Sequence, residues 1–493
     1  MKQLIPWTSE EIIKATGGAA VSGKDKHTFT GVSIDSRTIA LGELFVAIKG
    51  NNHDGHAFAE AVVEQGIKGI VINKQKAGEL LCDKLKNQDV FCIEVDNTTK
   101  ALGDLAAYNR TRADVSVVAI TGSNGKTSTK EMANAIVSRK FDTLSTTGNL
   151  NNEIGLPLTL LKLCSSQKWA VLELGMNHPG EIARLAEICK PDIGIITNIG
   201  RGHLEGLKTI EGVMNAKGEL LDGIKPDGTA ILNADDERVM CLARKTTRNV
   251  IYFGLSENAL IKASSVEVNK NLTSFVLKLP DDSIRVELNA PGRFMVSNAL
   301  AAASVGYLLN LSAQEIKSGL ENFAPVKGRM NITTLQNGVT IIDDSYNANP
   351  DSMEAAIKSL AGLKGKNRGA LVAGDMLELG IYSETLHKKI GELCAECGIE
   401  RLYATGQFSS DIAAGAIIGG MDISSVFTGS QEDILSDMTE WLRPEDWILI
   451  KGSRAMGMEK IVVKLKEWTG RSAGLKKAEN KESYTNNIGK VNL

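Results

Sequence analysis

The chain has 493 residues, of which 43% are hydrophobic, and a formal net charge of -3 at pH 7. This length exceeds what a single hydrophobic core usually organises, and it predicts about three domains. The nearly balanced charge argues against a general nucleic-acid or membrane-surface binder, because such proteins carry a strong basic excess.

The N-terminal stretch MKQLIPWTSEEII contains Pro6, Glu10 and Glu11 and lacks the apolar centre of a signal peptide. The most apolar stretch, residues 299–309, is too short to cross a bilayer. Seven scattered cysteines fit reduced thiols better than a disulfide framework. We therefore expect a cytoplasmic protein without stable membrane insertion.

Residues 1–113 have the pattern of a small α/β domain. Strands are expected at 32–34, 44–48 and 69–72, and a helix at 57–65. Polar residues gather at the strand ends, where α/β sheets place ligand loops: Ser36, Arg37, Lys49, Asn51, Asn52, His53 and Asp54. A binding site and a solvated rim explain this cluster equally well. His53 and His56 flank a loop, which favours ordinary packing over metal binding.

The strongest functional signal is VSVVAITGSNGKTSTKEM, residues 115–132. A β-branched run at 115–120 predicts a buried strand, and a glycine loop then leads into a helix, which is the arrangement of a phosphate cradle. The glycines let backbone N–H groups point inward, and the helix N-terminus favours an anion. Lys126 would reach the β- and γ-phosphates, and the Thr127 hydroxyl would bind Mg²⁺. Two residues rather than the usual four separate Gly122 from Gly125.

A second polar substrate is indicated beside this loop. After a helix expected at 130–140, the stretch LSTTGNLNNEIGLPLTLL places several amides between a strand and a helix that Pro157 would hold off. Thr147 and Asn149 are the candidate contacts in it.

Three further residues are expected near the phosphate loop. Glu173 ends the strand expected at 169–174, where a carboxylate commonly holds Mg²⁺. His203 follows the strand expected at 192–198, and Lys217 lies in the helix VMNAKGELL. Since the carboxyl ends of parallel strands share one edge of a sheet, together they predict a metal and phosphate site.

The central domain is expected to end near residue 328. Short alternating strands at 251–288 predict an antiparallel addition to the central sheet. Asn298 then lies near the start of an alanine-rich helix, and core packing accounts for the alanines but not for the amide.

Residues 329–470 have a repeated βαβ pattern, typical of a doubly wound sheet. Strands are expected at 340–343, 369–373, 401–405 and 447–450, with Asp343, Asp344 and Asn347 in the loop before a helix opened by Pro350 and Asp351. Ser453 follows the last strand, and either substrate binding or a helix cap explains it. Cys394 and Cys397 form a CxxC within a helical pattern, which favours core packing. The polar tail 471–493 is expected to be disordered.

These motifs resemble those of the Mur ligase family, enzymes that extend the peptide of bacterial peptidoglycan precursors. The contracted loop TGSNGKTSTKEM matches the family's ATP loop, and DSRTIALGELFVAIKGNNHDGH is similar to its first domain. The other matching stretches are STTGNLNNEIGLPLTLL, ELGMNHPGEIA, GHLEGL, NAKGEL, GRFMVSNALAAA, GRM, DDSYNANPDSM, AGDMLELG and KGSRAMGME. The resemblance covers about residues 30–465, with several motifs in one order.

The resemblance implies a three-domain α/β enzyme with a small UDP-binding domain, a central ATP-binding sheet and a C-terminal ligase domain. The motif sequences are most similar to those of members that join a UDP-N-acetylmuramoyl-tripeptide to D-Ala-D-Ala through an acyl phosphate, using ATP and Mg²⁺. We expect a monomer.

The resemblance also implies the residue roles. ATP would contact the loop and three further residues: Thr121, Gly122, Ser123, Asn124, Gly125, Lys126, Thr127, Ser128, Asn298, Arg329 and Asp344. One Mg²⁺ would be held by Thr127 and Glu173, and a second by His203 and Lys217, the lysine as a carbamate. Lys126, His203 and Lys217 would act in catalysis. The substrates would contact Ser36, Arg37, Thr147, Asn149 and Ser453. A plain ammonium at Lys217, contacting phosphate or Glu219, is the alternative to the carbamate.

Three other functions fit the sequence less well. The family member that adds the third peptide residue would show an Asp-Asn-Pro-Arg motif, which is absent from this sequence. A folylpolyglutamate synthase would share the ATP loop but not the first domain. A GTPase would need an Asn-Lys-x-Asp motif, for which TNIG at 197–200 is a poor substitute.

Overall fold

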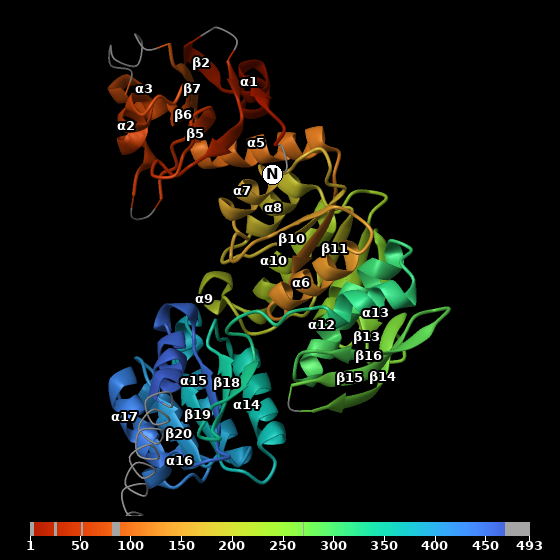
Figure 1. Cartoon of the computed structure of the whole chain (residues 1–493), viewed down its shortest axis with the longest axis vertical. Helices are drawn as coiled ribbons and strands as arrows, with labels where there is room; N and C mark the ends of the chain where they lie inside the picture. Colours follow the sequence, from red (N-terminus) through yellow and green to blue (C-terminus); the bar gives the residue numbers. More distant parts are fainter. Residues whose placement is uncertain (1–3, 24–26, 51–52, 81–88, 270, 469–493) are drawn as a thin grey trace, which may run out of the picture.

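A computed structural model describes residues 4–23, 27–50, 53–80, 89–269 and 271–468. Three large sheets follow one another along the chain, and Figure 1 shows them stacked along the long axis of the molecule. The short strands β1 and β3 form a separate antiparallel pair. The expected α/β class is confirmed. Asn51, Asn52 and the tail 471–493 lie outside the described residues.

The first sheet has five strands in the order β2-β7-β6-β5-β4. Its strands are parallel except that β2 pairs antiparallel with β7. The elements of this region are β1 (Trp7–Thr8), α1 (Ser9–Thr16), β2 (Ala19–Ser22), β3 (Thr28–Phe29), β4 (Gly31–Ser33), β5 (Glu43–Val46), η1 (Gly55–Phe58), α2 (Ala59–Glu64), β6 (Gly69–Asn73), α3 (Lys74–Leu80), β7 (Phe91–Val95) and α5 (Thr98–Ala113).

The second sheet has nine strands in the order β16-β15-β14-β13-β12-β11-β8-β10-β9. Its strands are β8 (Ser116–Thr121), β9 (Thr143–Ser145), β10 (Trp169–Glu173), β11 (Ile193–Ile196), β12 (Thr229–Asn233), β13 (Asn249–Gly254), β14 (Ile261–Val268), β15 (Thr273–Lys278) and β16 (Ser283–Leu288). Its helices are α6 (Lys126–Val137), α7 (Gly155–Leu160), α8 (Glu181–Cys189), α9 (Leu204–Leu207), α10 (Ile210–Gly223), α11 (Glu237–Ala243), α12 (Arg293–Leu308) and α13 (Ala313–Glu321).

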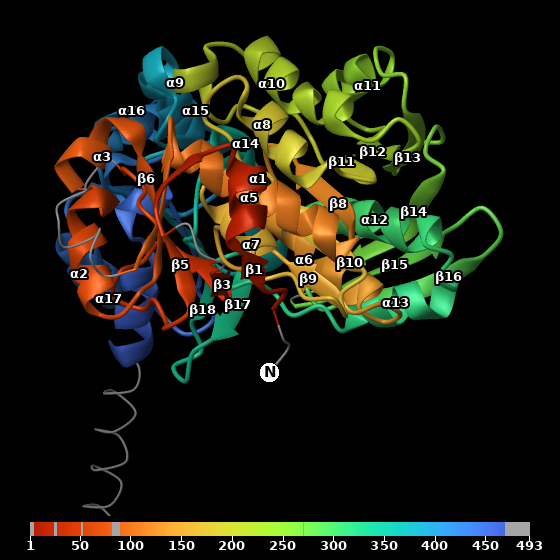
Figure 2. The same cartoon turned by 90° about the horizontal axis from the view of Figure 1, so that it is seen from above.

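Helices cover both faces of this sheet around β8, as Figure 2 shows. Side chains alternate along β8, so Val117 and Ala119 pack into one core while Val118 and Ile120 pack into another. Because β8 lies between β10 and β11, both of its faces are buried, which accounts for its continuous apolar run. The phosphate loop therefore leaves a rigid strand in the middle of the sheet.

The third sheet has six strands in the order β17-β18-β22-β19-β20-β21, parallel except for β17. Its elements are β17 (Asn331–Thr334), β18 (Thr340–Asp344), α14 (Pro350–Lys364), β19 (Gly369–Ala373), η2 (Gly380–Tyr382), α15 (Ser383–Glu396), β20 (Arg401–Ala404), α16 (Ser409–Ile418), η3 (Ile423–Ser425), β21 (Val426–Thr428), α17 (Gln431–Trp441), β22 (Trp447–Lys451) and η4 (Arg454–Met456).

Several local predictions need correction. Helix α6 begins at Lys126, directly after Gly125, and ends at Val137, so the expected span 130–140 was wrong. Pro157 lies in the first turn of α7, where a missing N–H is tolerated, and does not hold the helix off. Strand β13 pairs in parallel with β12 and β14, so only β14–β16 form the antiparallel addition. Asp343 and Asp344 end strand β18 rather than lying in a loop.

Candidate active site

The phosphate loop packs too tightly for side chains at its two glycines. Gly122 and Gly125 have φ angles of +149° and +82°, in the region that glycine favours. A Cβ at Gly125 would lie 2.2 Å from Asn298 Oδ1, and one at Gly122 would lie 1.9 Å from Thr197 Oγ1. Asn298, in the second turn of α12, therefore presses its amide against the loop. Together these contacts fix the loop at the carboxyl end of β8.

A hydroxyl, a carboxylate and a guanidinium meet just after this loop. Thr127 Oγ1 donates to Glu173 Oε2 at 2.8 Å, and Arg329 Nη2 donates to Thr127 Oγ1 at 3.0 Å. Glu173 Oε1 accepts from Asn151 Nδ2 at 2.8 Å. Thr127 and Glu173 thus present two oxygens of the kind that Mg²⁺ prefers, side by side and held by neighbours.

The Lys126 ammonium turns back onto the phosphate loop. Its Nζ donates to Gly122 O at 2.8 Å. Burial lowers the pKa of Lys126, and Glu173 acts in the opposite direction. Burial has removed water from this ammonium group, and a bound anion would stabilise its charge in place of that water. Lys126 is therefore suited to contact a phosphate.

His203 and Lys217 lie close enough to Lys126 for their charges to interact. His203 Nδ1 lies 2.6 Å from Glu378 Oε2, a residue of the third sheet's loops, and burial lowers the pKa of His203. Lys217 is only 1% exposed, and burial, followed by the charge of Lys126, holds its pKa well below the ordinary value. The Glu219 carboxylate accepts from the backbone N–H groups of residues 180 and 183, so both of its oxygens have hydrogen-bond partners other than Lys217.

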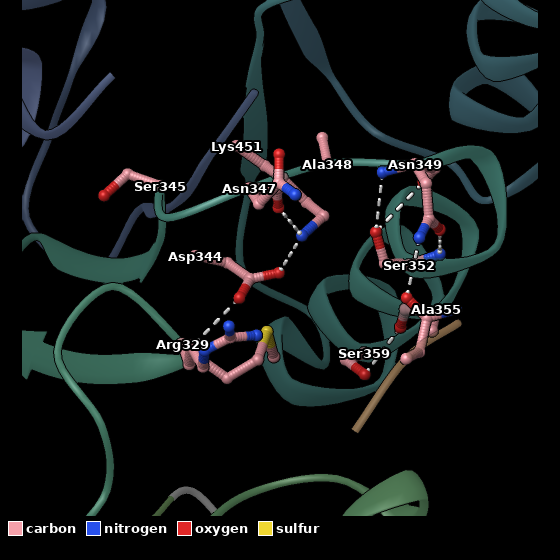
Figure 3. Close-up of polar contacts among 12 residues, drawn as sticks. Arg329, Asp344, Ser345, Asn347, Ala348, Asn349, Ser352, Ala355, Ser359 and Lys451 are labelled. Atoms are coloured by element: carbon pink, nitrogen blue, oxygen red, sulfur yellow. Dashed lines mark hydrogen bonds and ion pairs between the residues drawn. The ribbon is translucent and has the colours of Figure 1, made fainter. Parts of the chain in front are cut away.

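Figure 3 shows a buried ion pair on the third-domain side of the site. Lys451 Nζ donates to Asp344 Oδ2 at 2.6 Å and to Asn347 O at 2.9 Å. Asp344 Oδ1 accepts from Met330 N at 3.1 Å. Burial raises the pKa of Asp344, while Lys451 is the first of the groups that oppose the shift. This pair joins the ends of β18 and β22 beside Arg329.

Ser453 does not cap the short helix that follows it. It occupies the N-cap position of η4, but its side chain makes no capping hydrogen bond there. Instead its Oγ accepts from Leu377 N at 2.8 Å and donates to Ala348 O at 3.3 Å. The helix-cap explanation is therefore wrong, and Ser453 ties two loops together at the edge of the third sheet.

We call the parts of the chain built around the first, second and third large sheets the first, second and third units. The second and third units contact each other directly at the site. Asn349 Nδ2 donates to Asn124 Oδ1, in the phosphate loop, at 2.9 Å. Arg201 Nε donates to Asp351 Oδ1 at 2.8 Å, and a Cβ at Gly200 would lie 2.4 Å from that carboxylate. These bonds bring the N-terminus of α14 against the loops of the central sheet.

A cavity of about 840 Å³ lies between these two units. Predicted residues in its wall include most of the phosphate loop and seven others: Ser123, Asn124, Gly125, Lys126, Thr127, Ser128, Asn149, Glu173, His203, Asn298, Arg329, Asp344 and Ser453. Four predicted positions lie behind or away from that wall, namely Thr121, Gly122, Thr147 and Lys217. Thr121 and Lys217 are buried, and Thr147 is exposed.

Ser36 and Arg37 also lie outside the cavity, in a turn of the first unit. Arg37 Nη2 contacts Asp35 Oδ2 at 2.7 Å, and the Arg37 side chain is 84% exposed. The pKa of Asp35 is lowered to about 2 by this guanidinium and by the Arg37 backbone N–H. The turn is thus satisfied by its own residues.

The remaining histidine and cysteine candidates have ordinary environments. His56 is buried, with Nδ1 2.6 Å from Asp54 Oδ1 and Nε2 accepting from Asn73 N. Cys394 is buried in α15, and burial raises its pKa. Across the described ranges, no group of three His, Cys, Asp or Glu residues forms a metal site. Among the same residues, no helix is both long and apolar enough to cross a membrane.

Four residues with clear contacts at the site were not singled out from the sequence: Asn151, Arg201, Glu378 and Lys451. Asn151, Glu378 and Lys451 lie in stretches that carry the family resemblance, and Arg201 directly follows TNIG at 197–200, so a local signal is present in the sequence. Their partners, however, come from distant segments, and a single sequence does not show such pairings.

Three family models match the chain in order. They are described as the Mur ligase family catalytic domain at residues 28–110, the Mur ligase middle domain at 120–306, and the Mur ligase glutamate ligase domain at 328–454. Together the matches include the phosphate loop, Glu173, Asp344 and Ser453.

Individual relatives match over nearly their whole length. The UDP-N-acetylmuramoyl-tripeptide--D-alanyl-D-alanine ligase of Escherichia coli is 38% identical over 445 residues, which are 89% of this chain and 94% of that protein. The crystal structure of MurF from Acinetobacter baumannii is 33% identical, with a TM-score of 0.85, covering 94% of this chain and all of that one. MurF from Thermotoga maritima in complex with ADP is 26% identical, with a TM-score of 0.79, covering 90% and 98%.

Proposed function

Because the chain belongs to the Mur ligase family, we propose that its cavity joins a UDP-N-acetylmuramoyl-tripeptide to D-Ala-D-Ala at the expense of ATP, in peptidoglycan precursor synthesis. The observation that carries this proposal is the cluster of Thr127, Glu173 and Arg329 beside the phosphate loop. It combines residues of two units around a phosphate-binding backbone, as a phosphoryl transfer followed by ligation requires. The enzyme is an ATP-dependent amide-forming ligase.

The reaction needs activation because a carboxylate and an amine do not condense in water. An oxygen of the tripeptide's C-terminal carboxylate attacks the γ-phosphorus in line, and the bond to the β,γ-bridging oxygen breaks, giving an acyl phosphate and ADP. The dipeptide amine then attacks the acyl carbon. The tetrahedral intermediate releases phosphate and a proton, and the amide remains.

The side chains of the cavity suit these steps. We assign Lys126 and Arg329 to the charge that develops on the transferred phosphoryl group, since both cations lie at the phosphate loop. Asn298 of α12 and Asp344 of β18, which both line the cavity, are assigned to the adenosine part of ATP. Asn149 and Ser453 are the candidate peptide contacts, and Thr147 lies close to Asn149 in the chain.

The donor set of Thr127 and Glu173 fits Mg²⁺. In phosphoryl-transfer sites this ion is commonly held by one or two carboxylates together with substrate phosphates and waters, so a three-residue protein cluster is not needed. When bound, Mg²⁺ would neutralise charge on the phosphates. Lys217 as a carbamate, with His203, would supply ligands for a second ion.

The three units have separate tasks in this proposal. Residues 1–113, with Ser36 and Arg37, bind the uridine diphosphate group, 114–328 bind ATP, and 329–470 contribute the acceptor side. Residues 327–328 connect the last two, and Gly328 has a φ of +72°, so we propose a hinge there that opens the cavity for substrates. We place the enzyme in the cytoplasm, where ATP is available, as a monomer.

Phosphate release by the purified protein tests this function. We expect release only when ATP, Mg²⁺, the UDP-tripeptide and D-Ala-D-Ala are all present. Replacing D-Ala-D-Ala by single amino acids tests the other family activities, and folate with glutamate tests folylpolyglutamate synthesis. Equal release with any of these acceptors would contradict the proposal.

A further inference from the structure

The basic side chains that line the cavity differ in what holds them. Lys126 binds the loop backbone and Arg329 binds Thr127, so both belong to the phosphate end. Lys451 is buried and paired with Asp344, and His203 is paired with Glu378. Arg454 differs from these, because its side chain is 61% exposed while it lines the same cavity, and its partner Glu459 is exposed as well. Arg454 is a cation available to a ligand at the mouth.

Two contacts, with Asn347 and with Tyr346, define the position of Arg454. Its backbone N–H donates to Asn347 Oδ1 at 3.2 Å. Its guanidinium carbon lies 5.5 Å from the centroid of the Tyr346 ring, and that of Arg329 lies 4.5 Å from the same centroid. Cation–π attraction to one ring therefore orients both arginines. Arg329 bonds to Thr127 next to the phosphate loop, whereas Arg454 is the more exposed of the two.

The acceptor of the proposed reaction has a matching requirement. D-Ala-D-Ala carries a nucleophilic amine at one end and a free carboxylate at the other, and an extended dipeptide spans about 7 Å. With its amine near Arg329, its carboxylate would reach Arg454, because the guanidinium carbons of both arginines lie within 5.5 Å of the Tyr346 ring centroid. Ser453 carries no charge, and its hydroxyl is bonded to Leu377 N and Ala348 O.

We propose that Arg454 binds the C-terminal carboxylate of the acceptor dipeptide. This inference rests on the proposed function and adds a specificity residue to it. A guanidinium matches a carboxylate with two parallel N–H···O bonds, and such charge-assisted bonds are stronger than neutral ones. Peptides blocked at this carboxylate would be poor acceptors.

Arg454 has a competing partner that must give way. Its Nη1 lies 3.1 Å from Glu459 Oε1, with the Glu459 side chain 37% exposed. Ion pairs at such exposed positions contribute little, so exchange for the substrate carboxylate is inexpensive. Glu459→Gln should leave the KM for D-Ala-D-Ala unchanged or lower it.

The test compares acceptors with and without the charge. Phosphate release is measured against D-Ala-D-Ala and against its C-terminal amide, in the wild type and in Arg454→Gln and Arg454→Lys, with ATP and UDP-tripeptide saturating. Arg454→Gln should raise the KM for D-Ala-D-Ala about 10- to 100-fold. Arg454→Lys should raise it less, because lysine keeps the positive charge but lacks the two parallel N–H donors of the guanidinium. The KM values for ATP and the UDP-tripeptide should stay unchanged.

The amide separates binding of the carboxylate from general damage. The wild type should use the amide poorly, and Arg454→Gln should use it no worse than the wild type does. The matched control is Arg285→Gln, which removes an exposed arginine paired to Glu267 at 3.2 Å outside the cavity. It should change neither the KM for D-Ala-D-Ala nor the KM for its amide.

An equal rise in KM for both acceptors, or none for D-Ala-D-Ala, would overturn the role of Arg454 and leave the proposed function standing. Absence of any D-Ala-D-Ala-dependent release in the wild type would overturn both.

Discussion

The cavity wall and the first unit's polar turn use similar residue types in opposite ways. In the cavity, Thr127 bonds to Glu173 and Arg329, which come from strands and loops far away in the chain. In the turn, Arg37 bonds to Asp35, only two residues away, and remains 84% exposed. Long-range bonds between buried or half-buried groups hold a geometry before substrate arrives. A local, exposed pair can rearrange, so substitutions there should cost far less.

The largest expected effect comes from the carboxylate in the cavity wall. Glu173→Gln keeps the shape of the side chain and an acceptor oxygen for Thr127. It removes the negative charge that we assign to binding Mg²⁺. Phosphate release should fall at least about 1000-fold, since a bound metal contributes several kcal/mol to such reactions. The unfolding midpoint should change little. Glu187→Gln, on the exposed side of α8, is the control, and equal losses in both variants would contradict the assignment.

A second substitution tests the buried lysine behind the wall. If the Lys217 amine reacts with CO₂ to give an anionic carbamate and a proton, Lys217→Arg restores the positive charge of an unmodified lysine but cannot supply the two carbamate oxygens. Activity should then fall about 100-fold, the scale expected when metal binding is impaired. Labelled bicarbonate should give a carbamate carbon signal in the wild type that the variant lacks. A fully active Lys217→Arg enzyme would refute the carbamate.

The third prediction concerns stability, through the buried pair of Asp344 and Lys451. Lys451→Met leaves a buried carboxylate unpaired and should lower the free energy of unfolding of its unit by about 3–5 kcal/mol at pH 8. Burial already raises the pKa of Asp344 above 3.8, and losing Lys451 raises it further. A carboxyl group whose pKa is higher in the folded chain than in the unfolded chain favours folding at low pH. This contribution to stability is lost as the pH rises through the folded-state pKa.

The penalty in Lys451→Met should therefore shrink as pH falls and Asp344 takes up a proton. Urea unfolding of the wild type and the variant at pH 5 and pH 8 measures this difference. The double variant with Asp344→Asn, which carries no buried charge at this pair, should show no such pH dependence. A penalty that grows toward low pH would contradict the burial of Asp344 as the cause.

The smallest effect is expected in the first unit's turn. Arg37→Gln should raise the KM for the UDP-tripeptide by less than about 10-fold and leave kcat and the thermal midpoint unchanged, because exposed pairs contribute little to stability. Steady-state kinetics with the UDP-tripeptide as the varied substrate checks this. A loss as large as that in Glu173→Gln would erase the contrast between the two regions.

The sequence predicts those parts of the site that lie within one βα unit. The strand, the loop and Lys126 could be found because strand periodicity and glycine spacing are local. The bond between His203 and Glu378, and that between Arg201 and Asp351, join segments about 150 residues or more apart. Such pairings follow from how the units pack, which a single sequence does not reveal. The helix-cap explanation for Ser453 failed for the same reason, since its partners come from two other loops.

Oxygen transfer from the tripeptide tests the central claim, that the cavity activates a carboxylate as an acyl phosphate. The terminal carboxylate of the UDP-tripeptide is labelled with ¹⁸O, and the phosphate released in the presence of ATP and D-Ala-D-Ala is analysed by mass spectrometry. Attack by the carboxylate on the γ-phosphorus predicts one labelled oxygen in each phosphate released, because the bridging oxygen departs with phosphorus. Phosphate without label, formed alongside the amide product, would contradict the account.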